Sequence, residues 1–183
     1  MGRDDLELIR RSRDGDTAAF GEIYEKYKAA VYSLAYRIVR NHADADELMQ
    51  ESFIRAYRYI SRYDASYSFY TWIRAIVVNL SRDWLRRNKT QQAGIEYYTA
   101  MSPQNPPKAD KLDRMADRQL IQQALSELSS QQRLSFVLFE VEGMNLVEIS
   151  IQLKCSVGTV KTHLHRARTQ LRNKLKNDYR DFK

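Results

Sequence analysis

The most informative stretch of the sequence is Val157-Gly158-Thr159-Val160-Lys161-Thr162-His163-Leu164-His165-Arg166-Ala167-Arg168. Apolar residues in and after this stretch recur every three or four positions, so on a helix they form a single stripe. The stripe consists of Val160, Leu164, Ala167, Leu171 and Leu175. We expect a helix that buries this stripe against a small core and turns its opposite side outward.

The opposite side of the expected helix is polar and basic. It carries Gly158, Thr162, His165, Arg166 and Thr169, flanked by Thr159, Lys161 and Arg172. From residue 154 to the C-terminus the sequence has nine Lys or Arg and two acidic residues. A basic stripe on one helix face is the electrostatic pattern of nucleic-acid binding, because it matches phosphates and base edges. A solvated amphipathic helix is the alternative interpretation of this segment alone.

A second helix is expected directly upstream, and it supports a helix-turn-helix. Asn145 and Glu148 have the spacing of a capping box, in which each side chain bonds the backbone amide of the other residue. The buried side of this helix is expected to carry Leu146, Ile149 and Leu153. Residues 154–156 form the expected turn, and Ser156 is a good N-cap for the helix that follows.

A third helix is expected from about Gln131 to Glu142; Ser129 can cap its start and Gly143 ends it. The apolar residues that it adds to the same small core are Leu134, Val137, Leu138 and Val141. A further helix before it carries Leu120, Ile121, Ala124, Leu125 and Leu128. Together these segments predict a small helical DNA-binding domain.

Composition limits the remaining possibilities. The chain has 183 residues, of which 43% are hydrophobic, enough for one ordinary domain or two small ones with real cores. There is no apolar run of membrane-spanning length and no signal-peptide pattern, so a cytoplasmic protein without membrane insertion is expected. Cys155 is the single cysteine, which excludes an internal disulfide. Since no convincing alternating pattern occurs, the predicted fold is all-α.

All three prolines lie between residues 103 and 107, within a largely polar stretch from about residue 90 to 111. Proline lacks the amide donor and disfavours helix in the residue before it, so this stretch is expected to be a flexible linker. The linker is expected to divide the chain into two small helical domains, residues 1–89 and residues 112–183.

The N-terminal domain shows four helical patterns, which begin near residues 4, 16, 43 and 68. The third pattern, about residues 43–60, buries Ala45, Met49, Ser52, Ala56 and Ile60. Its other face carries Asp44, Glu47, Gln50, Glu51 and Ile54. An acidic face with an apolar residue within it fits a protein-docking surface, and a merely solvated acidic face fits this pattern equally well.

The fourth pattern, about residues 68–87, separates an apolar stripe from a polar one. The apolar stripe is Ile73, Ile76, Val77, Leu80 and Trp84, and the polar stripe is Ala75, Asn79, Arg82 and Arg86. The preceding loop, residues 62–67, adds aromatic and hydrogen-bonding side chains. Aromatic, Arg and Asn side chains gathered in one place can stack on unpaired bases and hydrogen-bond to them. For any one tyrosine, an ordinary structural role is the more frequent alternative.

Three motifs follow one another along the chain. They are Asp44-Ala45-Asp46-Glu47-Leu48-Met49-Gln50-Glu51-Ser52-Phe53, then Phe69-Tyr70-Thr71-Trp72-Ile73 with Asn79 and Arg86-Arg87, and then Gly158-Thr159-Val160-Lys161 with His165-Arg166-Ala167-Arg168. In this order they resemble an extracytoplasmic-function (ECF) sigma factor of bacterial RNA polymerase, in the sigma-70 family. The resemblance covers residues 5–175 and implies a chain that directs core polymerase to specific promoters.

The resemblance also implies roles for particular residues. The surface that binds the clamp helices of the polymerase β′ subunit would consist of Asp44, Glu47, Gln50, Glu51 and Ile54. Contacts to the melted −10 promoter element would come from Arg62, Tyr63, Ser66, Tyr67, Ser68, Trp72, Asn79, Arg82 and Arg86. Contacts to the −35 duplex would come from Ser156, Thr159, Lys161, Thr162, His165, Arg166 and Arg172. The polymerase β flap and an anti-sigma factor are further implied partners.

Other classes of function have less support. A stand-alone helix-turn-helix regulator would share the DNA-binding domain, but such proteins normally dimerise, and no sustained heptad for a dimer helix is present. A protein-interaction adaptor with a basic tail is the third possibility. His163 and His165 point to different sides of a helix, so no metal shared with Cys155 is expected. No nucleophile–base pair or paired carboxylates indicate an enzyme, and no cofactor is expected.

Overall fold

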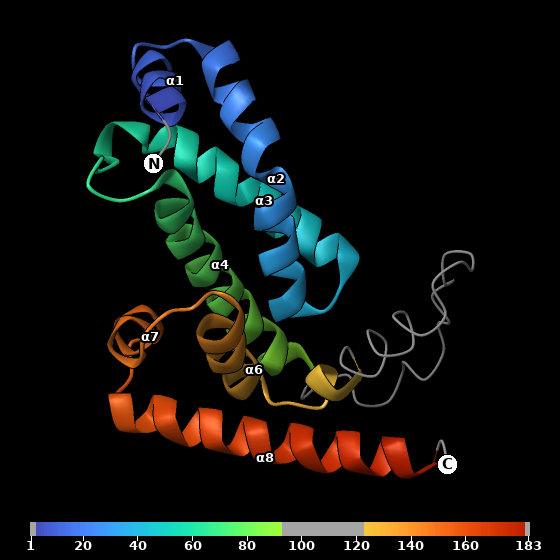
Figure 1. Cartoon of the computed structure of the whole chain (residues 1–183). Helices are drawn as coiled ribbons and strands as arrows, with labels where there is room; N and C mark the ends of the chain where they lie inside the picture. The colour runs from blue at the N-terminus through green and yellow to red at the C-terminus, as the bar shows by residue number, and fades with distance from the viewer. Residues whose placement is uncertain (1–2, 93–122, 182–183) are drawn as a thin grey trace. The chain divides into compact units, whose positions relative to one another are not determined.

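The computed structural model describes residues 3–92 and 123–181, which form helices joined by short connections (Figure 1). No strand occurs among these residues, which confirms the all-α prediction. The chain divides into two compact units, Met1–Leu85 and Arg86–Lys183. None of the helices in the described ranges is long and apolar enough to cross a membrane.

The helices of the N-terminal unit have ends that local chemistry explains. They are α1 (Arg3–Arg13), α2 (Thr17–Val39), α3 (His42–Arg58), the 3-10 helix η1 (Ile60–Arg62) and α4 (Phe69–Gln92), of which the part up to Leu85 belongs to this unit. The Asp16 carboxylate accepts the Ala19 amide at 3.0 Å and caps α2. Arg40 adopts a left-handed conformation with φ 65° and ends that helix. The Asn41 side chain then accepts the Ala43 amide at 2.8 Å and starts α3.

An apolar core joins these helices. α2 packs against both α1 and α3 (Figure 1). The buried side chains of α2 to α4 include Ile23, Val31, Leu34, Ile38, Phe53, Phe69, Ile73, Val77 and Leu80. Ile76 and Trp84, which the sequence assigns to the same stripe, are half-buried instead. Ile76 lies on the flank of the stripe at 100° per residue, and the large indole of Trp84 donates a hydrogen bond to the half-exposed Asp44.

α4 continues to Gln92, so the helix extends past residue 90, where the sequence predicts the linker to begin. The three residues at the end of α4 include neither proline nor glycine, and nothing in them stops a helix. The remainder of the predicted linker lies outside the described residues, as do Leu120 and Ile121. The domain boundaries that depend on the linker stay a prediction.

The C-terminal unit confirms the predicted helix caps. Its main helices are α6 (Ser130–Phe136), the π-helix η2 (Val137–Val141), α7 (Leu146–Leu153) and α8 (Val157–Asp181). Ser129 and Gln132 form a capping box at α6, and Asn145 and Glu148 form another at α7. The buried apolar residues of the unit include Leu125, Leu128, Leu134, Val137, Leu138, Ile149, Leu153, Val160, Leu164 and Ala167.

Among the predicted core residues of this unit, Leu146, Leu171 and Leu175 are half-buried, and the prediction is wrong for Val141. Helical periodicity places Val141 beside Leu134 and Leu138, but its side chain is 47% exposed. After α6 the chain enters the wider turn η2, in which the Glu142 amide bonds the carbonyl of Val137 rather than of a residue four positions back. Because a π-helical turn holds more residues than an α-helical one, the side chains after it rotate off the buried stripe.

Candidate nucleic-acid and protein interfaces

A tight turn after α7 fixes the start of α8. Lys154 adopts a left-handed conformation with φ 55° and ends α7. The Ser156 hydroxyl then accepts the Thr159 amide at 3.0 Å and caps α8. The α8 residues that are buried in the core are Val160, Leu164 and Ala167. Their burial fixes the rotation of α8 about its axis and confirms the predicted helix-turn-helix.

The outer side of α8 carries the candidate duplex-binding residues. We call its five exposed members the α8 face: Lys161, Thr162, His165, Arg166 and Arg172. The Thr162 hydroxyl donates to the Gly158 carbonyl at 3.0 Å, which leaves its oxygen lone pairs available as acceptors. The hydroxyls of the other two candidates, Ser156 and Thr159, lie 2.9 Å apart within the cap. These two residues therefore also have a structural role.

Other basic residues of α8 are bound within the C-terminal unit. Arg168 donates to the Glu140 carboxylate at 2.9 and 2.7 Å, and its guanidinium carbon lies 5.3 Å from the centroid of the Phe139 ring. Lys174 pairs with Glu127 at 2.9 Å. These contacts tie α8 to the neighbouring elements. The positive charge of α8 is thus divided between cations that brace the helix and cations that the α8 face presents outward.

The two histidines of α8 lie in different environments. His163 is half-buried, and burial together with the charge of Arg166 lowers the pKa of its imidazole below the ordinary value. His165 is exposed on the α8 face. In the part of the chain that the structure describes, no group of three or more His, Cys, Asp or Glu side chains could hold a metal ion.

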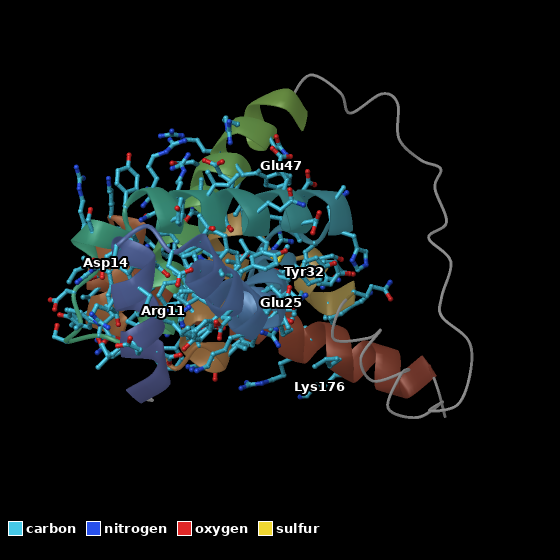
Figure 2. All side chains as sticks on the ribbon, turned by 90° about the horizontal axis from the view of Figure 1, so that it is seen from above. Arg11, Asp14, Glu25, Tyr32, Glu47 and Lys176 are labelled. Carbon is cyan, nitrogen blue, oxygen red and sulfur yellow. The ribbon has the colours of Figure 1, made fainter. Side chains whose placement is uncertain are left out.

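α3 presents the candidate docking residues on its outer side. Glu47, Gln50 and Ile54 are exposed, while Asp44 and Glu51 are half-buried. We call these five residues the α3 face, and Figure 2 shows Glu47 on the outer side of the helix. Ile54 is 52% exposed although it is apolar. An exposed apolar side chain among acids fits a protein-docking surface and also fits a solvated one, because single exposed apolar side chains are common on protein surfaces.

The residues of the α3 face differ in whether their side chains already make hydrogen bonds within the chain. The Gln50 amide donates to Asp46 at 2.7 Å, and Arg55 donates to the Glu51 carboxylate at 2.6 Å. Glu47 makes neither a hydrogen bond nor an ion pair with any described residue. Its carboxylate is therefore the acid of this face that is most available to a partner.

Asp44 lies at the inner edge of the α3 face. Burial raises the pKa of its carboxyl, and the charge of Glu47 raises it further, whereas a hydrogen bond from Trp84 acts in the opposite direction. Asp44 therefore helps to fix α3 to α4, in addition to any contact with a partner.

Tyr63, in the loop between α3 and α4, is part of the core. Its side chain is 4% exposed, and its ring centroid lies 6.1 Å from that of Phe69 and 5.4 Å from that of Trp72. The Tyr63 hydroxyl donates to the Tyr67 carbonyl. Since its ring presents no face for base stacking, we correct the sequence-based assignment of a DNA contact at Tyr63 to a structural role. The reason is that a bulky aromatic gains more from burial in the core than from exposure.

Short-range hydrogen bonds shape the rest of this loop. The Ser66 amide donates to the Asp64 carboxylate at 2.9 Å, and hydrogen bonds from Ser66 lower the pKa of Asp64. The Ser68 hydroxyl accepts the Thr71 amide at 3.1 Å and caps the start of α4. Ser68, a predicted −10 contact, therefore also has a capping role.

The exposed −10 candidates lie on the loop and along α4. We call them the α3–α4 loop surface: Arg62, Ser66, Tyr67, Asn79 and Arg86. The half-buried candidates are Trp72 and Arg82. Tyr67 is 60% exposed, and the Arg62 guanidinium lies 5.0 Å from the centroid of the Tyr59 ring. The Asn79 side chain makes no hydrogen bond with the described residues, so its amide is available to a ligand.

Sequence reasoning missed one residue at this loop. Arg13 of α1 donates from Nε to the Ile60 carbonyl at 3.1 Å, and from Nη2 to the Tyr63 carbonyl. These carbonyls belong to residues 47 and 50 positions further along the chain. No local pattern links residues so far apart, so the sequence contains no signal that could have predicted the contact.

Comparison with known proteins agrees with this architecture. Residues 23–91 match the family described as Sigma-70 region 2, and residues 118–171 match Sigma-70, region 4. The ECF RNA polymerase sigma factor SigW of Bacillus subtilis is 33% identical over 178 residues, covering 92% of this chain and 95% of that protein. The ECF RNA polymerase sigma-E factor of Salmonella typhimurium is 30% identical over 185 residues, covering 93% and 94%.

Solved structures support the fold. The sigma factor RpoE in complex with the anti-sigma factor NepR, from Bartonella quintana, has a TM-score of 0.66 and 22% identity, covering 86% of this chain and 96% of that chain. CnrH in complex with the cytosolic domain of CnrY has a TM-score of 0.62 and 22% identity, covering 96% and 99%. Fold, family matches and relatives together define a bacterial transcription initiation factor. The chain belongs to the ECF group of the sigma-70 family of RNA polymerase sigma factors.

Membership of this family defines the general function of the chain. A sigma factor directs core RNA polymerase to specific promoters and initiates transcription there. The two matched regions and the near-complete coverage of the relatives favour this function over that of a stand-alone helix-turn-helix regulator.

Proposed function

We propose that the three surfaces described above divide the work of promoter recognition. The α3 face binds the clamp helices of the β′ subunit, the α3–α4 loop surface holds unpaired bases of the −10 element, and the α8 face enters the major groove of the −35 element. The observation that carries the proposal is the opposite charge of two exposed helix faces, acidic on α3 and basic on α8. RNA synthesis belongs to the polymerase, so this chain supplies specificity rather than catalysis.

The α8 face has the chemistry that duplex recognition needs. An α-helix fits the major groove, where each base pair presents its own pattern of donors and acceptors. The fork of Arg166 can donate two hydrogen bonds to one guanine, whereas Arg172 lies further along the helix and contacts phosphate. Thr162 lies one turn before Arg166 on the same side of α8, whereas Lys161 lies on the opposite flank of the exposed side.

The α3–α4 loop surface has the chemistry that single-strand recognition needs. The Asn79 amide offers both a donor and an acceptor to one base edge. The exposed ring of Tyr67 offers a surface for stacking, and Arg62 and Arg86 offer positive charge to the backbone. Extrusion of a base from the duplex costs a few kcal/mol, which these contacts must offset.

Further partners are proposed on the same grounds. Val147 and Ile151 are apolar residues of α7 that are 57% and 73% exposed, which favours a protein contact by the C-terminal unit. We assign that contact to the polymerase β flap. Because RpoE and CnrH are structurally similar to this chain and form complexes with NepR and CnrY, an anti-sigma factor is a proposed partner as well. Since polymerase and promoters are the targets, the site of action is the cytoplasm.

The docking surface is tested by charge reversal. The variant Glu47→Lys/Glu51→Lys should lose holoenzyme assembly by at least about a hundredfold in affinity, because like charges brought together at an interface cost several kcal/mol. The control is Glu22→Lys/Glu25→Lys, which makes the same charge change at exposed positions of α2. Binding to core polymerase is measured by titration, and folding by thermal melting.

A folded Glu47→Lys/Glu51→Lys variant that binds core polymerase as tightly as the parent would show that the α3 face is misassigned. Equal losses in the test and control variants would instead indicate a general effect of charge, and the assignment of α3 would fail in that case too.

A further inference from the structure

α1 reaches the loop between α3 and α4 through one side chain. Arg13 donates to the Ile60 carbonyl at 3.1 Å and to the Tyr63 carbonyl, and its guanidinium carbon lies 5.9 Å from the centroid of the Tyr63 ring. Ile60 begins η1 and Tyr63 follows its last residue. A single cation therefore holds both ends of the turn from which the loop departs.

The helix that carries Arg13 is itself fixed in place. Asp5 of α1 is buried, accepts the Tyr27 hydroxyl at 2.9 Å and bonds the Lys26 ammonium, and both partners belong to α2. The ring of Tyr27 in turn lies 5.2 Å from that of Phe69, the first residue of α4. Arg13 therefore extends from a helix that is fixed to α2, and α2 in turn contacts the first residue of α4.

The order imposed at Tyr63 continues into the exposed part of the loop. The Tyr63 hydroxyl donates to the Tyr67 carbonyl, and the Tyr67 amide donates to the Asp64 carbonyl at 3.2 Å. The exposed ring of Tyr67 is thus connected to Arg13 through Tyr63. A substitution of Arg13 should therefore shift the position of the Tyr67 side chain, although Tyr67 itself is unchanged.

We propose that Arg13 is a positioning residue for −10 recognition, which fixes the loop in the conformation that receives an unpaired base and does not itself contact DNA. This inference rests on the −10 assignment of the proposed function. A guanidinium suits the task because its planar fork offers donors to two carbonyls at once, which an ammonium does not match in geometry. A loop ordered before binding loses less conformational entropy when it takes up a base.

The test compares holoenzymes that carry Arg13→Ala, Arg13→Lys and Arg10→Ala. Arg10 is the matched control, since it is an exposed arginine of α1 that bonds Glu7 on the same helix. Four quantities are measured: affinity for core polymerase, affinity for a −35 duplex, open-complex formation on duplex promoters, and base preference in a library randomised at the −10 element.

Arg13→Ala should reduce open-complex formation by about tenfold, the effect of losing one charge-assisted hydrogen-bond contact. It should also broaden the −10 base preference while core and −35 affinities stay unchanged. Arg13→Lys, which keeps the charge but not the planar fork of donors, should lie between parent and Arg13→Ala, and Arg10→Ala should behave as the parent. The change in base preference is the readout that a merely structural role would not produce.

Two results would overturn the inference. One is an Arg13→Ala or Arg13→Lys holoenzyme with the parental −10 preference; the other is a loss of core affinity and melting temperature in step with activity. Tyr67→Ala separates the inference from the proposed function. If Tyr67→Ala alters −10 preference and the Arg13 variants do not, the positioning role alone is wrong; if neither alters it, the −10 assignment of the loop is wrong as well.

Discussion

The α8 face and the α3–α4 loop surface differ in how their side chains are placed. On α8, one regular helix with a buried stripe of Val160, Leu164 and Ala167 sets the direction of every exposed residue. At the loop, α1, η1 and α4 all contribute, and the exposed Tyr67 is bonded to the buried Tyr63. Substitutions on the α8 face should therefore change DNA binding alone. Substitutions around the loop should affect both stability and DNA binding, and the effect on stability should be larger for the more buried residue.

The largest expected effect tests this difference within the loop. Tyr63→Ala should lower the free energy of unfolding by about 3–5 kcal/mol, because it removes a buried aromatic ring from the core. Tyr67→Ala removes an exposed ring and should change stability by less than about 0.5 kcal/mol while weakening −10 binding. Chemical denaturation and binding to single-stranded −10 DNA in holoenzyme measure the two effects. Similar stabilities for the two variants would contradict the structural role given to Tyr63.

The next effect concerns the α8 face. Arg166→Ala should lose roughly 1–3 kcal/mol of discrimination at one base position of the −35 element, because a bidentate contact to guanine is removed. Arg172→Ala should weaken binding to all promoter sequences alike. The slope of log affinity against log salt concentration should fall by about one, as expected for the loss of one phosphate contact. Selection from a promoter library and salt titrations distinguish the two. If the promoters that the Arg166→Ala variant selects have the same −35 preference as those selected by the parent, another residue makes the base contact.

Asn79→Ala tests a residue that lies on the regular helix α4 but that we assign to the α3–α4 loop surface. Open-complex formation on duplex promoters should fall by about tenfold through the loss of paired hydrogen bonds to a base. Core and −35 binding should stay intact, and a promoter with a pre-melted −10 region should regain part of the activity. Thermal melting is the control: a markedly destabilised variant whose activity falls with its fold would assign Asn79 a structural role instead.

The smallest effect is a pH dependence in the C-terminal unit. Burial and Arg166 lower the pKa of His163, so the folded state favours the neutral imidazole. The unfolded chain then binds more protons near the ordinary histidine pKa, and stability falls as the pH drops below about 6.5. His163→Gln should reduce this fall relative to the parent in denaturation curves at pH 5.5 and 7.5. An unchanged pH dependence would remove His163 as its source.

Several features of the fold could be predicted from the sequence because they depend on residues close together in the chain. Asn145 and Glu148 are three positions apart, and Ser156 precedes its helix directly, so their caps follow from local geometry. The buried stripe and the α8 face follow from the period of one regular helix. The exposure of Glu47, Gln50 and Ile54 on α3 follows from the same period, although no sequence pattern shows what binds there.

Only the tertiary structure decided the features that break the period or join distant residues. Val141 is exposed because a π-helical turn shifts the register after α6. Tyr63 is buried because Phe69 and Trp72 fold over it, and Arg13 holds the loop through carbonyls 47 and 50 residues away. The sequence by itself therefore determined the helices, their caps and the face that α8 turns outward, because periodicity and capping act within a few residues. The shape of the α3–α4 loop depended on packing between elements, since that contact energy is gained only when the chain brings distant residues together.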